Sequence, residues 1–239
     1  GGFVCAFALC TFSGYWSMAQ RCVVDMTMCF FITAAMFSFH MFATRKGRHG
    51  ALWAGLFALA AGGAVMTKGL VGLAVPSSAL FFWLVLRRDF TLKSWACLFI
   101  GAGLSLAPVA IWLAFLRAGA GQEAFDTVVW TNNLGRFTGS HSEHVEGFFY
   151  YFEKEPTRLL PWLIFIVPAV AHLRKSMRTH KDSILFVLCW FIIPFALLSM
   201  AAGKRSLYLL PLDPAAALLL GMPLAAAVEN ITSKEKITY

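Results

Sequence analysis

Charged side chains are scarce in this sequence. They make up 13% of its 239 residues, whereas hydrophobic residues make up 59% and the mean hydropathy is +0.70. A water-soluble domain typically carries about 25% charged residues and could not bury so much apolar surface. The scarcity of charge therefore excludes a soluble globular protein and indicates a polytopic membrane protein.

A continuous basic face is also lacking, although the formal net charge is +8. The Lys and Arg residues lie in short clusters between apolar runs, which is typical of loops that face an anionic membrane surface. Nucleic-acid-binding proteins instead concentrate positive charge on one face or along one helix. We therefore expect membrane lipids, and no nucleic acid, among the partners.

Paired cysteines are absent as well, because none of the six cysteines forms a C-x-x-C motif. Their spacing offers neither a disulfide framework nor a zinc site. All six lie within or beside apolar runs, so we expect small buried hydrophobic side chains. They are Cys5, Cys10, Cys22, Cys29, Cys97 and Cys189.

The sequence also lacks an initial Met, a basic n-region and a signal-peptide cleavage pattern, and it begins Gly-Gly-Phe within an apolar stretch. We therefore expect residues 1–239 to be a fragment, a single transmembrane domain without its N-terminal part.

Apolar runs long enough to cross a bilayer dominate what is present, and a polar segment at residues 118–158 interrupts the series. The pattern predicts an all-α polytopic membrane protein with about seven complete transmembrane helices, one partial helix and one long outer loop. Within that loop, Glu123–Trp130 is predicted to form an amphipathic helix on the membrane surface. The runs are 2–13, 25–42, 51–65, 73–86, 96–116, 159–173, 184–200 and 208–228.

Basic residues predict the orientation of these helices. If the loops at residues 45–48, 87–93 and 174–181 share one side with the C-terminal tail, that side holds twelve of the twenty Lys and Arg residues. Short loops with such an excess face the cytoplasm. The outer side then carries the unusual charges, which are Arg21, Asp25, Lys68, those of the 118–158 loop, Lys204 and Arg205.

Lys68 stands between two apolar runs, and no Asp or Glu lies within fifteen residues of it on either side. A cation in or beside hydrocarbon costs a few kcal/mol, so we expect a partner or an anionic ligand. Gly62, Gly63, Gly69 and Gly72 allow close approach of the backbone to that ligand. The alternative is a lysine that extends from a helix end to the lipid headgroups.

Arg136 lies in the outer loop between Gly135 and Phe137. Its planar guanidinium would fit a phosphate, and the alternative is a solvated loop arginine. The same loop contains His141-Ser142-Glu143-His144, but H-x-x-H with one carboxylate and no further ligand at a fixed spacing is a weak metal signal. We therefore expect no bound metal and no cofactor.

Lys204, Arg205 and Tyr208 add two cations and a phenol to the outer side, at the start of the last helix. Lipid headgroups could pair with these cations, and Tyr208 could belong to an interfacial aromatic belt. Together with Lys68 and Arg136, however, they would form a cationic pocket at the outer membrane surface. Such a pocket compensates the charge that grows on a departing lipid-linked phosphate.

Two acidic residues also lie at helix starts. Asp25 is suited to be the N-cap of its helix, or to orient a substrate or a neighbouring cation. Asp213 lies between Leu212 and Pro214 in apolar sequence, which indicates a buried partner.

Five short motifs occur along the chain between Tyr15 and Val228. They are QRCVVDM at residues 20–26, MTKGLVGLAVP at 66–76, RF with a later His and YY at 136–151, PW at 161–162, and KRSLYLLP at 204–211. In this order they resemble the AR-x-D-M, LTKGP-x-G…P, RF…H…YY, PW and KRPLYLLP motifs of bacterial membrane glycosyltransferases related to aminoarabinose transferase. That family groups with the protein O-mannosyltransferases in the lipid-dependent GT-C class.

The resemblance implies a donor that is a polyprenyl-phosphate sugar, bound through its phosphate by Lys68 and Arg136 with Tyr208 beside it and Lys204 in support. It also implies that an acceptor (lipid A phosphate, a protein hydroxyl or another glycan) attacks the anomeric carbon with inversion while polyprenyl phosphate leaves. The implied location is the periplasmic face of the bacterial inner membrane.

The chain departs from the family pattern at Gly135, where the family has a carboxylate. The family's catalytic base belongs to an acidic pair in a first outer loop, which we expect upstream of residue 1 together with further helices. We also expect the soluble C-terminal domain that some members carry to lie outside residues 1–239. Asp25 is implied to lie in the active-site cavity, without an assigned step.

We therefore expect a glycosyltransferase, incomplete in this chain. The alternative is a transporter or flippase of an anionic lipid-linked substrate, which would need polar residues at mid-depth along several helices. A purely structural membrane subunit would leave Lys68 and Asp213 unexplained.

Overall fold

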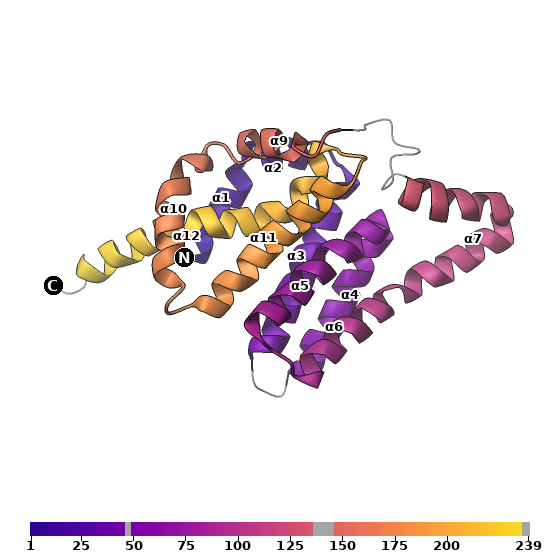
Figure 1. Cartoon of the computed structure of the whole chain (residues 1–239), viewed down its shortest axis with the longest axis horizontal. Helices are drawn as coiled ribbons and strands as arrows, with labels where there is room; N and C mark the ends of the chain where they lie inside the picture. The colour runs from indigo at the N-terminus through magenta and orange to yellow at the C-terminus, as the bar shows by residue number, and fades with distance from the viewer. Residues whose placement is uncertain (46–48, 136–145, 236–239) are drawn as a thin grey trace.

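The computed structural model describes residues 1–45, 49–135 and 146–235, and every regular element in these residues is a helix (Figure 1). The α-helices are α1 (Gly2–Thr11), α2 (Ser13–Ala19), α3 (Val24–Thr44), α4 (Gly50–Lys68), α5 (Leu70–Arg87), α6 (Leu92–Ser105), α7 (Ala107–Asp126), α9 (Tyr150–Arg158), α10 (Ile166–Ser176), α11 (Lys181–Met200) and α12 (Asp213–Glu235). A π-helix, η1 (Thr127–Gly135), and two 3₁₀ helices, η2 (Trp162–Phe165) and η3 (Ser206–Leu212), complete the set.

Six helical segments in the described residues are long and apolar enough to cross a membrane. They are Val24–Thr44, Gly50–Lys68, Leu70–Arg87, Leu92–Thr131, Lys181–Met200 and Ser206–Glu229. These segments confirm the predicted all-α polytopic fold.

Two further predicted spans are bent pairs of helices, so the number of spans rises to eight if each pair counts as one. The helices Gly2–Thr11 and Ser13–Ala19 meet at 70°, and Tyr150–Arg158 meets Trp162–Ser176 at 98°. The predicted run 159–173 is therefore not one straight helix, because it begins at a sharp turn after α9.

The core lies where α3, α4, α5 and α11 pack together. Large aromatic side chains fill it, and Phe39, Phe57 and Trp83 are almost completely buried. By contrast, α7 has no buried residue and projects from this bundle (Figure 1). The chain stays helical through the predicted segment Glu123–Trp130, and the placement of that segment on a membrane surface stays a prediction.

The short connection between α4 and α5 depends on two glycines. Gly69 has φ 65° and ψ −142°, a conformation that other residues rarely adopt, and it ends α4 directly after Lys68. At Gly72 a Cβ atom would collide with the backbone of Ala64. The two helices therefore approach closely at the end of the bundle where Lys68 lies.

The prediction for the cysteines is partly wrong. Cys5, Cys29, Cys97 and Cys189 are buried free thiols, as expected, but Cys10 and Cys22 are exposed. Cys10 lies on the outer face of α1, between the buried Ala8 and Phe12, and Cys22 lies in the turn before α3.

Candidate functional site

Lys68 forms an ion pair with Asp25, its ammonium Nζ bonding to the carboxylate Oδ1. The pair forms because α3 and α4 are antiparallel neighbours of 21 and 19 residues, so the last residue of α4 lies beside the first turn of α3. The Asp25 side chain is 10% exposed and that of Lys68 is 22% exposed. The lysine is thus held at the rim of the bundle and still reaches its surface.

Asp25 is not an N-cap, which corrects one of the two predicted roles. The N-cap position belongs to Val23, and no side-chain cap hydrogen bond is made there. Asp25 lies within the first turn, and its carboxylate faces Lys68 instead. The other expectation, that Asp25 orients a neighbouring cation, agrees with this geometry.

Tyr208 covers the same lysine from a third element. The Lys68 Nζ lies 4.4 Å from the centroid of the Tyr208 ring, a distance at which a cation is attracted by the electron-rich face of the ring. Three segments that are remote in sequence, at residues 25, 68 and 208, therefore meet at one ammonium group.

The 3₁₀ helix η3 that carries Tyr208 is fixed by hydrogen bonds from three sides. The Cys29 Sγ donates to the Leu210 carbonyl oxygen at 3.2 Å, and the Trp190 indole donates to the Pro211 carbonyl oxygen at 3.0 Å. The Tyr151 hydroxyl donates to the Arg205 carbonyl oxygen at 3.4 Å, just before η3 begins. The position of Tyr208 is thus tied to α3, α9 and α11.

Lys204 and Arg205 differ in their surroundings. Lys204 is 3% exposed, and its ammonium donates to the Glu146 carbonyl oxygen at 2.8 Å. Arg205 is exposed. Lys204 thus joins the segment just before η3 to the segment just before α9, and a role of either Lys204 or Arg205 in binding a substrate stays a prediction.

Part of the predicted site lies outside the described residues. These positions are Arg136, His141, Glu143 and His144. In the described residues there is no group of three or more His, Cys, Asp or Glu side chains that could hold a metal ion.

A buried charge cluster next to η3 contains two residues that the sequence reasoning missed. The Arg158 Nη2 donates to the Asp213 Oδ2 at 2.7 Å, and the Arg158 Nε lies 3.3 Å from the Glu155 Oε2. All three side chains are at most 7% exposed. The predicted buried partner of Asp213 is therefore Arg158. The spacing of Glu155 and Arg158 on one helix face could have suggested their own pair, but not a partner 55 positions away.

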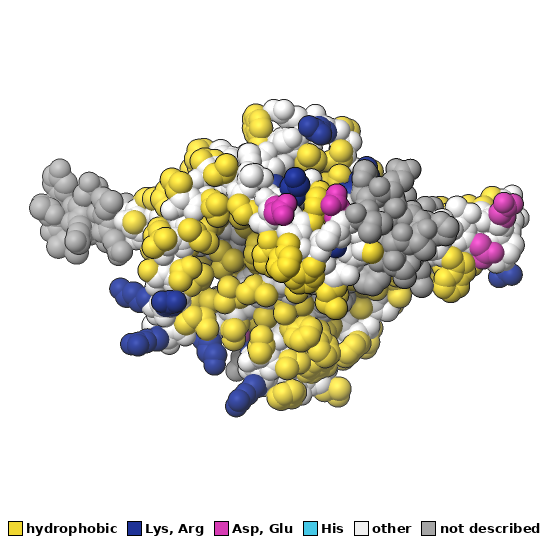
Figure 2. All heavy atoms as spheres, turned by 45° about the horizontal axis from the view of Figure 1, so that its top comes forward, with side chains coloured by type: hydrophobic (Ala, Val, Ile, Leu, Met, Phe, Trp, Pro, Cys, Tyr) yellow, Lys and Arg dark blue, Asp and Glu magenta, His cyan; other side chains and the backbone are white. Residues whose placement is uncertain are grey.

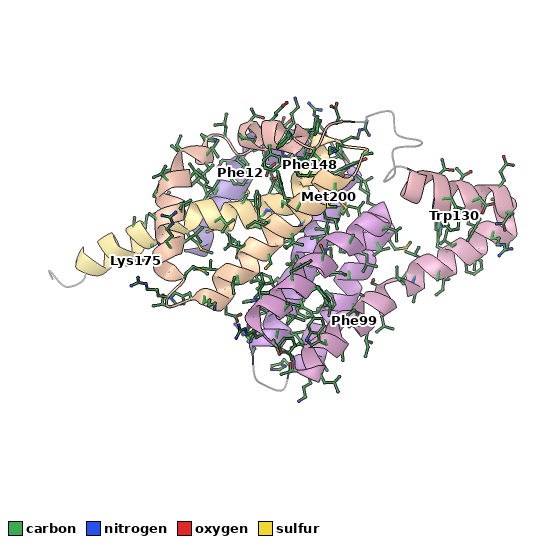
Figure 3. All side chains as sticks on the ribbon, viewed as in Figure 1. Phe12, Phe99, Trp130, Phe148, Lys175 and Met200 are labelled. Carbon is green, nitrogen blue, oxygen red and sulfur yellow. The ribbon has the colours of Figure 1, made fainter. Side chains whose placement is uncertain are left out.

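The outer loop also packs on the N-terminal helices through this cluster. The Ser13 hydroxyl donates to the Thr157 carbonyl oxygen at 2.6 Å. A Cβ atom at Gly14 would collide with the Arg158 side chain. Figure 3 shows Phe148, just before α9, and Met200, at the end of α11, at this same end of the molecule.

Curated relatives match most of this chain. A protein of Erwinia tasmaniensis, named undecaprenyl phosphate-alpha-4-amino-4-deoxy-L-arabinose arabinosyl transferase, is 30% identical over 209 residues, which cover 86% of this chain and 37% of the relative. A protein of the same name from Aeromonas salmonicida is 31% identical, with coverages of 87% and 37%. The chain thus spans little more than a third of the length of these relatives.

Solved structures agree in fold. The crystal structure of ArnT from Cupriavidus metallidurans bound to undecaprenyl phosphate has a TM-score of 0.74 and 22% identity, and the match covers 93% of this chain and 43% of ArnT. The same protein in the apo state gives a TM-score of 0.68. No family model matches the chain. The resemblance inferred from the five motifs is confirmed: the chain is a homologue of the undecaprenyl phosphate-aminoarabinose arabinosyl transferases and corresponds to part of their length.

Proposed function

We propose that this chain forms part of a glycosyltransferase that moves a sugar from a polyprenyl-phosphate donor to an acceptor. The acceptor is a lipid A phosphate, a protein hydroxyl or another glycan. The observation that carries the proposal is a single lysine, Lys68, held between a carboxylate and an aromatic ring where a bundle of membrane-type helices ends. The names of the relatives, and the undecaprenyl phosphate bound to ArnT, support the class of donor.

The chemistry explains why a fixed ammonium is useful at this position. As the bond between the anomeric carbon and the phosphate oxygen breaks, negative charge grows on the departing phosphate. A cation that is already in place stabilises that charge without reorganising solvent, and the poorly hydrated surroundings strengthen the effect. Lys68 supplies this cation in the proposal, and the fork-shaped guanidinium of Arg136 is the second phosphate ligand.

Asp25 has a supporting role in this proposal. In the absence of donor, its carboxylate offsets the positive charge of Lys68, whose burial would otherwise cost several kcal/mol. It also limits the rotamers of a flexible side chain, so less entropy is lost when the phosphate arrives. Asp25 therefore positions the phosphate ligand, while the base that activates the acceptor is not assigned to this chain.

The remaining predicted ligands act around this centre. Tyr208 covers Lys68 and limits its access to water, and Lys204 holds the segment before α9 against the start of η3. Arg205 adds an exposed cation that attracts anionic lipid. The basic loops at the other ends of the helices favour a periplasmic position of this site at the bacterial inner membrane.

The test replaces Lys68 by Ala in the longest reading frame that includes this chain. Sugar transfer from a polyprenyl-phosphate donor should fall at least a hundredfold, while membrane insertion stays at the wild-type level. The exposed Lys154 on α9 provides the matched control, since Lys154→Ala removes the same charge and should retain transfer.

Full transfer activity in the Lys68→Ala protein would contradict the proposal. Movement of a labelled lipid across proteoliposome membranes by the wild-type protein, without any sugar transfer, would favour the transporter instead.

A further inference from the structure

A second cationic pocket lies at the end of α5 that is remote from Lys68. Helix α5 has 18 residues and is therefore about 27 Å long, close to the thickness of the hydrocarbon core of a bilayer. The pocket has a volume of about 670 Å³ and lies between the end of α5 and the start of α11. Its lining residues are Leu86, Arg87, Arg88, Lys181, Asp182 and Leu185.

The charges of this pocket do not balance within the described residues. Three cations face one carboxylate, and the Arg87 Nε forms an ion pair with Asp182 at 3.3 Å. The guanidinium of Arg87 lies 5.0 Å from the centroid of the Trp83 ring, and its buried Nη1 atom has no hydrogen-bond partner in the described part of the chain. Neither Arg88 nor Lys181 forms an ion pair there. The pocket thus carries an excess of positive charge, and its wall includes a buried guanidinium nitrogen that makes no hydrogen bond in the described residues.

The backbone at Arg88 supplies an independent observation. Arg88 has φ 60° and ψ 36°, the left-handed conformation that ends many helices. The Arg88 N–H donates to the Val85 carbonyl oxygen and the Asp89 N–H to the Leu84 carbonyl oxygen, both at 3.0 Å. Glycine is by far the commonest residue at such a position. An arginine is not needed to end the helix at this position. Its long side chain instead places a guanidinium group in the wall of the pocket.

Apolar side chains continue from the pocket along the surface of α5. Phe82, Val85 and Leu86 are 44%, 36% and 52% exposed, and their spacing puts them on neighbouring turns of one helix face. A ligand that has both an anionic group and a hydrocarbon chain could contact the cations and this face at the same time. Free phosphate would use the cations alone.

Basic residues gather at this end of the molecule. Figure 2 shows Lys and Arg side chains projecting at the lower edge of the molecule, and Figure 3 shows Lys175 on the lower part of α10. Such clusters attract anionic lipids by about 1 kcal/mol for each Lys or Arg near the membrane surface.

We propose that the pocket between α5 and α11 binds the phosphate of an anionic phospholipid, with an acyl chain against Phe82, Val85 and Leu86. The site is separate from the Lys68 site and faces the opposite membrane surface. It does not depend on the proposed transfer reaction, since occupancy is measured as lipid binding.

The test measures phosphatidylglycerol binding to the purified chain in detergent by native mass spectrometry. Arg88→Gly removes the cation and supplies the residue that the helix end prefers, so its thermal unfolding midpoint should equal or exceed that of the wild type. Its affinity for phosphatidylglycerol should nevertheless fall at least fivefold, as should that of Lys181→Gln. Arg88→Asn, which also tolerates the left-handed conformation, should behave in the same way.

Lys93→Gln is the matched control, because Lys93 is exposed at the same end of the molecule but does not line the pocket. It should bind phosphatidylglycerol as the wild type does. Wild-type affinity in Arg88→Gly and Lys181→Gln, or an equal loss in Lys93→Gln, would overturn the proposal. Equal binding of phosphatidylcholine, or full competition by inorganic phosphate at the same concentration, would also overturn it, since the site would then not select an anionic lipid.

Discussion

At the scale of single residues, the central feature is the way in which Lys68 is accommodated. A lysine at the end of an apolar helix must either reach water or find compensation for its charge. The structure supplies both, because the Asp25 carboxylate pairs with the ammonium, the Tyr208 ring covers it, and 22% of the side chain stays exposed. The Lys68 ammonium is therefore compensated when no ligand is bound, and it can still be reached by an anion.

A double-mutant cycle on Asp25 and Lys68 measures this compensation. Asp25→Asn and Lys68→Met should each destabilise the protein, since each leaves the other group partly buried without its partner. The double variant should be more stable than the sum of the single effects predicts, with a coupling free energy of about 1–3 kcal/mol. Thermal unfolding in detergent gives the values. Additive effects of the two substitutions would show that the ion pair contributes nothing.

Two substitutions of Tyr208 separate the contribution of its aromatic ring to donor binding from that of its hydroxyl group. Phenylalanine keeps the aromatic face over Lys68, whereas leucine removes it, and a cation–π contact contributes about 0.5–2 kcal/mol. The affinity for polyprenyl phosphate should therefore change little in Tyr208→Phe and fall about threefold to thirtyfold in Tyr208→Leu. An equal loss in both variants would instead assign the effect to the hydroxyl.

At the scale of secondary structure, the short helix α9 connects the outer loop to the elements around the site. Its Arg158 pairs with Asp213 at the first residue of α12, directly after η3. The same stretch accepts hydrogen bonds from Ser13. The C-terminal end of η3, the segment that carries Tyr208, is therefore held in place by the Arg158–Asp213 ion pair.

Removing the arginine tests this connection. Arg158→Met leaves Asp213 buried without its partner and should lower the free energy of unfolding by about 3–5 kcal/mol. In Arg158→Met/Asp213→Asn the uncompensated charge of Asp213 is gone while Glu155 remains, so about half of the loss should be recovered. Thermal or denaturant unfolding compares the variants. Equal stability of the single and double variants would mean that the ion pair is not what holds these elements together.

The connection between α5 and α6 has a pH-sensitive element. Partial burial would raise the pKa of Asp89, but hydrogen bonds from Thr91 and Ser94 outweigh this effect and lower it below its usual value. A lowered pKa means that the ionised carboxylate stabilises the fold at neutral pH, and that this contribution is lost as the pH falls through the folded-state pKa. Asp89→Asn should therefore lower stability slightly at pH 7 and have no effect in acid below that pKa. A difference between the two proteins that persisted in acid would contradict this assignment.

At the scale of the whole molecule, the sequence predicted the membrane-spanning helices well and the contacts between them poorly. Long apolar runs such as 25–42 and 184–200 have few alternatives to a spanning helix, so α3 and α11 lie close to their predicted ranges. Apolar length does not reveal a sharp bend, however, so the turn between α9 and α10 was missed.

In the candidate site, too, individual residues were predicted better than the contacts between them. Lys68 and Tyr208 were predicted from their motifs, and both take part in one cluster. The search for a carboxylate near Lys68 along the sequence failed because Asp25 is 43 positions away and becomes a neighbour only when α3 packs antiparallel to α4. Arg158 and Glu155 were missed for a related reason, since their burial depends on helices from both ends of the chain.

The central claim is that Lys68 binds the phosphate of a lipid-linked donor, and the most direct measurement is the affinity of the purified chain for polyprenyl phosphate. A hydrogen bond to a charged group contributes about 1.5–3 kcal/mol, so Lys68→Ala should weaken binding at least tenfold, whereas Lys154→Ala should bind as the wild type does. Wild-type affinity in the Lys68→Ala protein would contradict the claim.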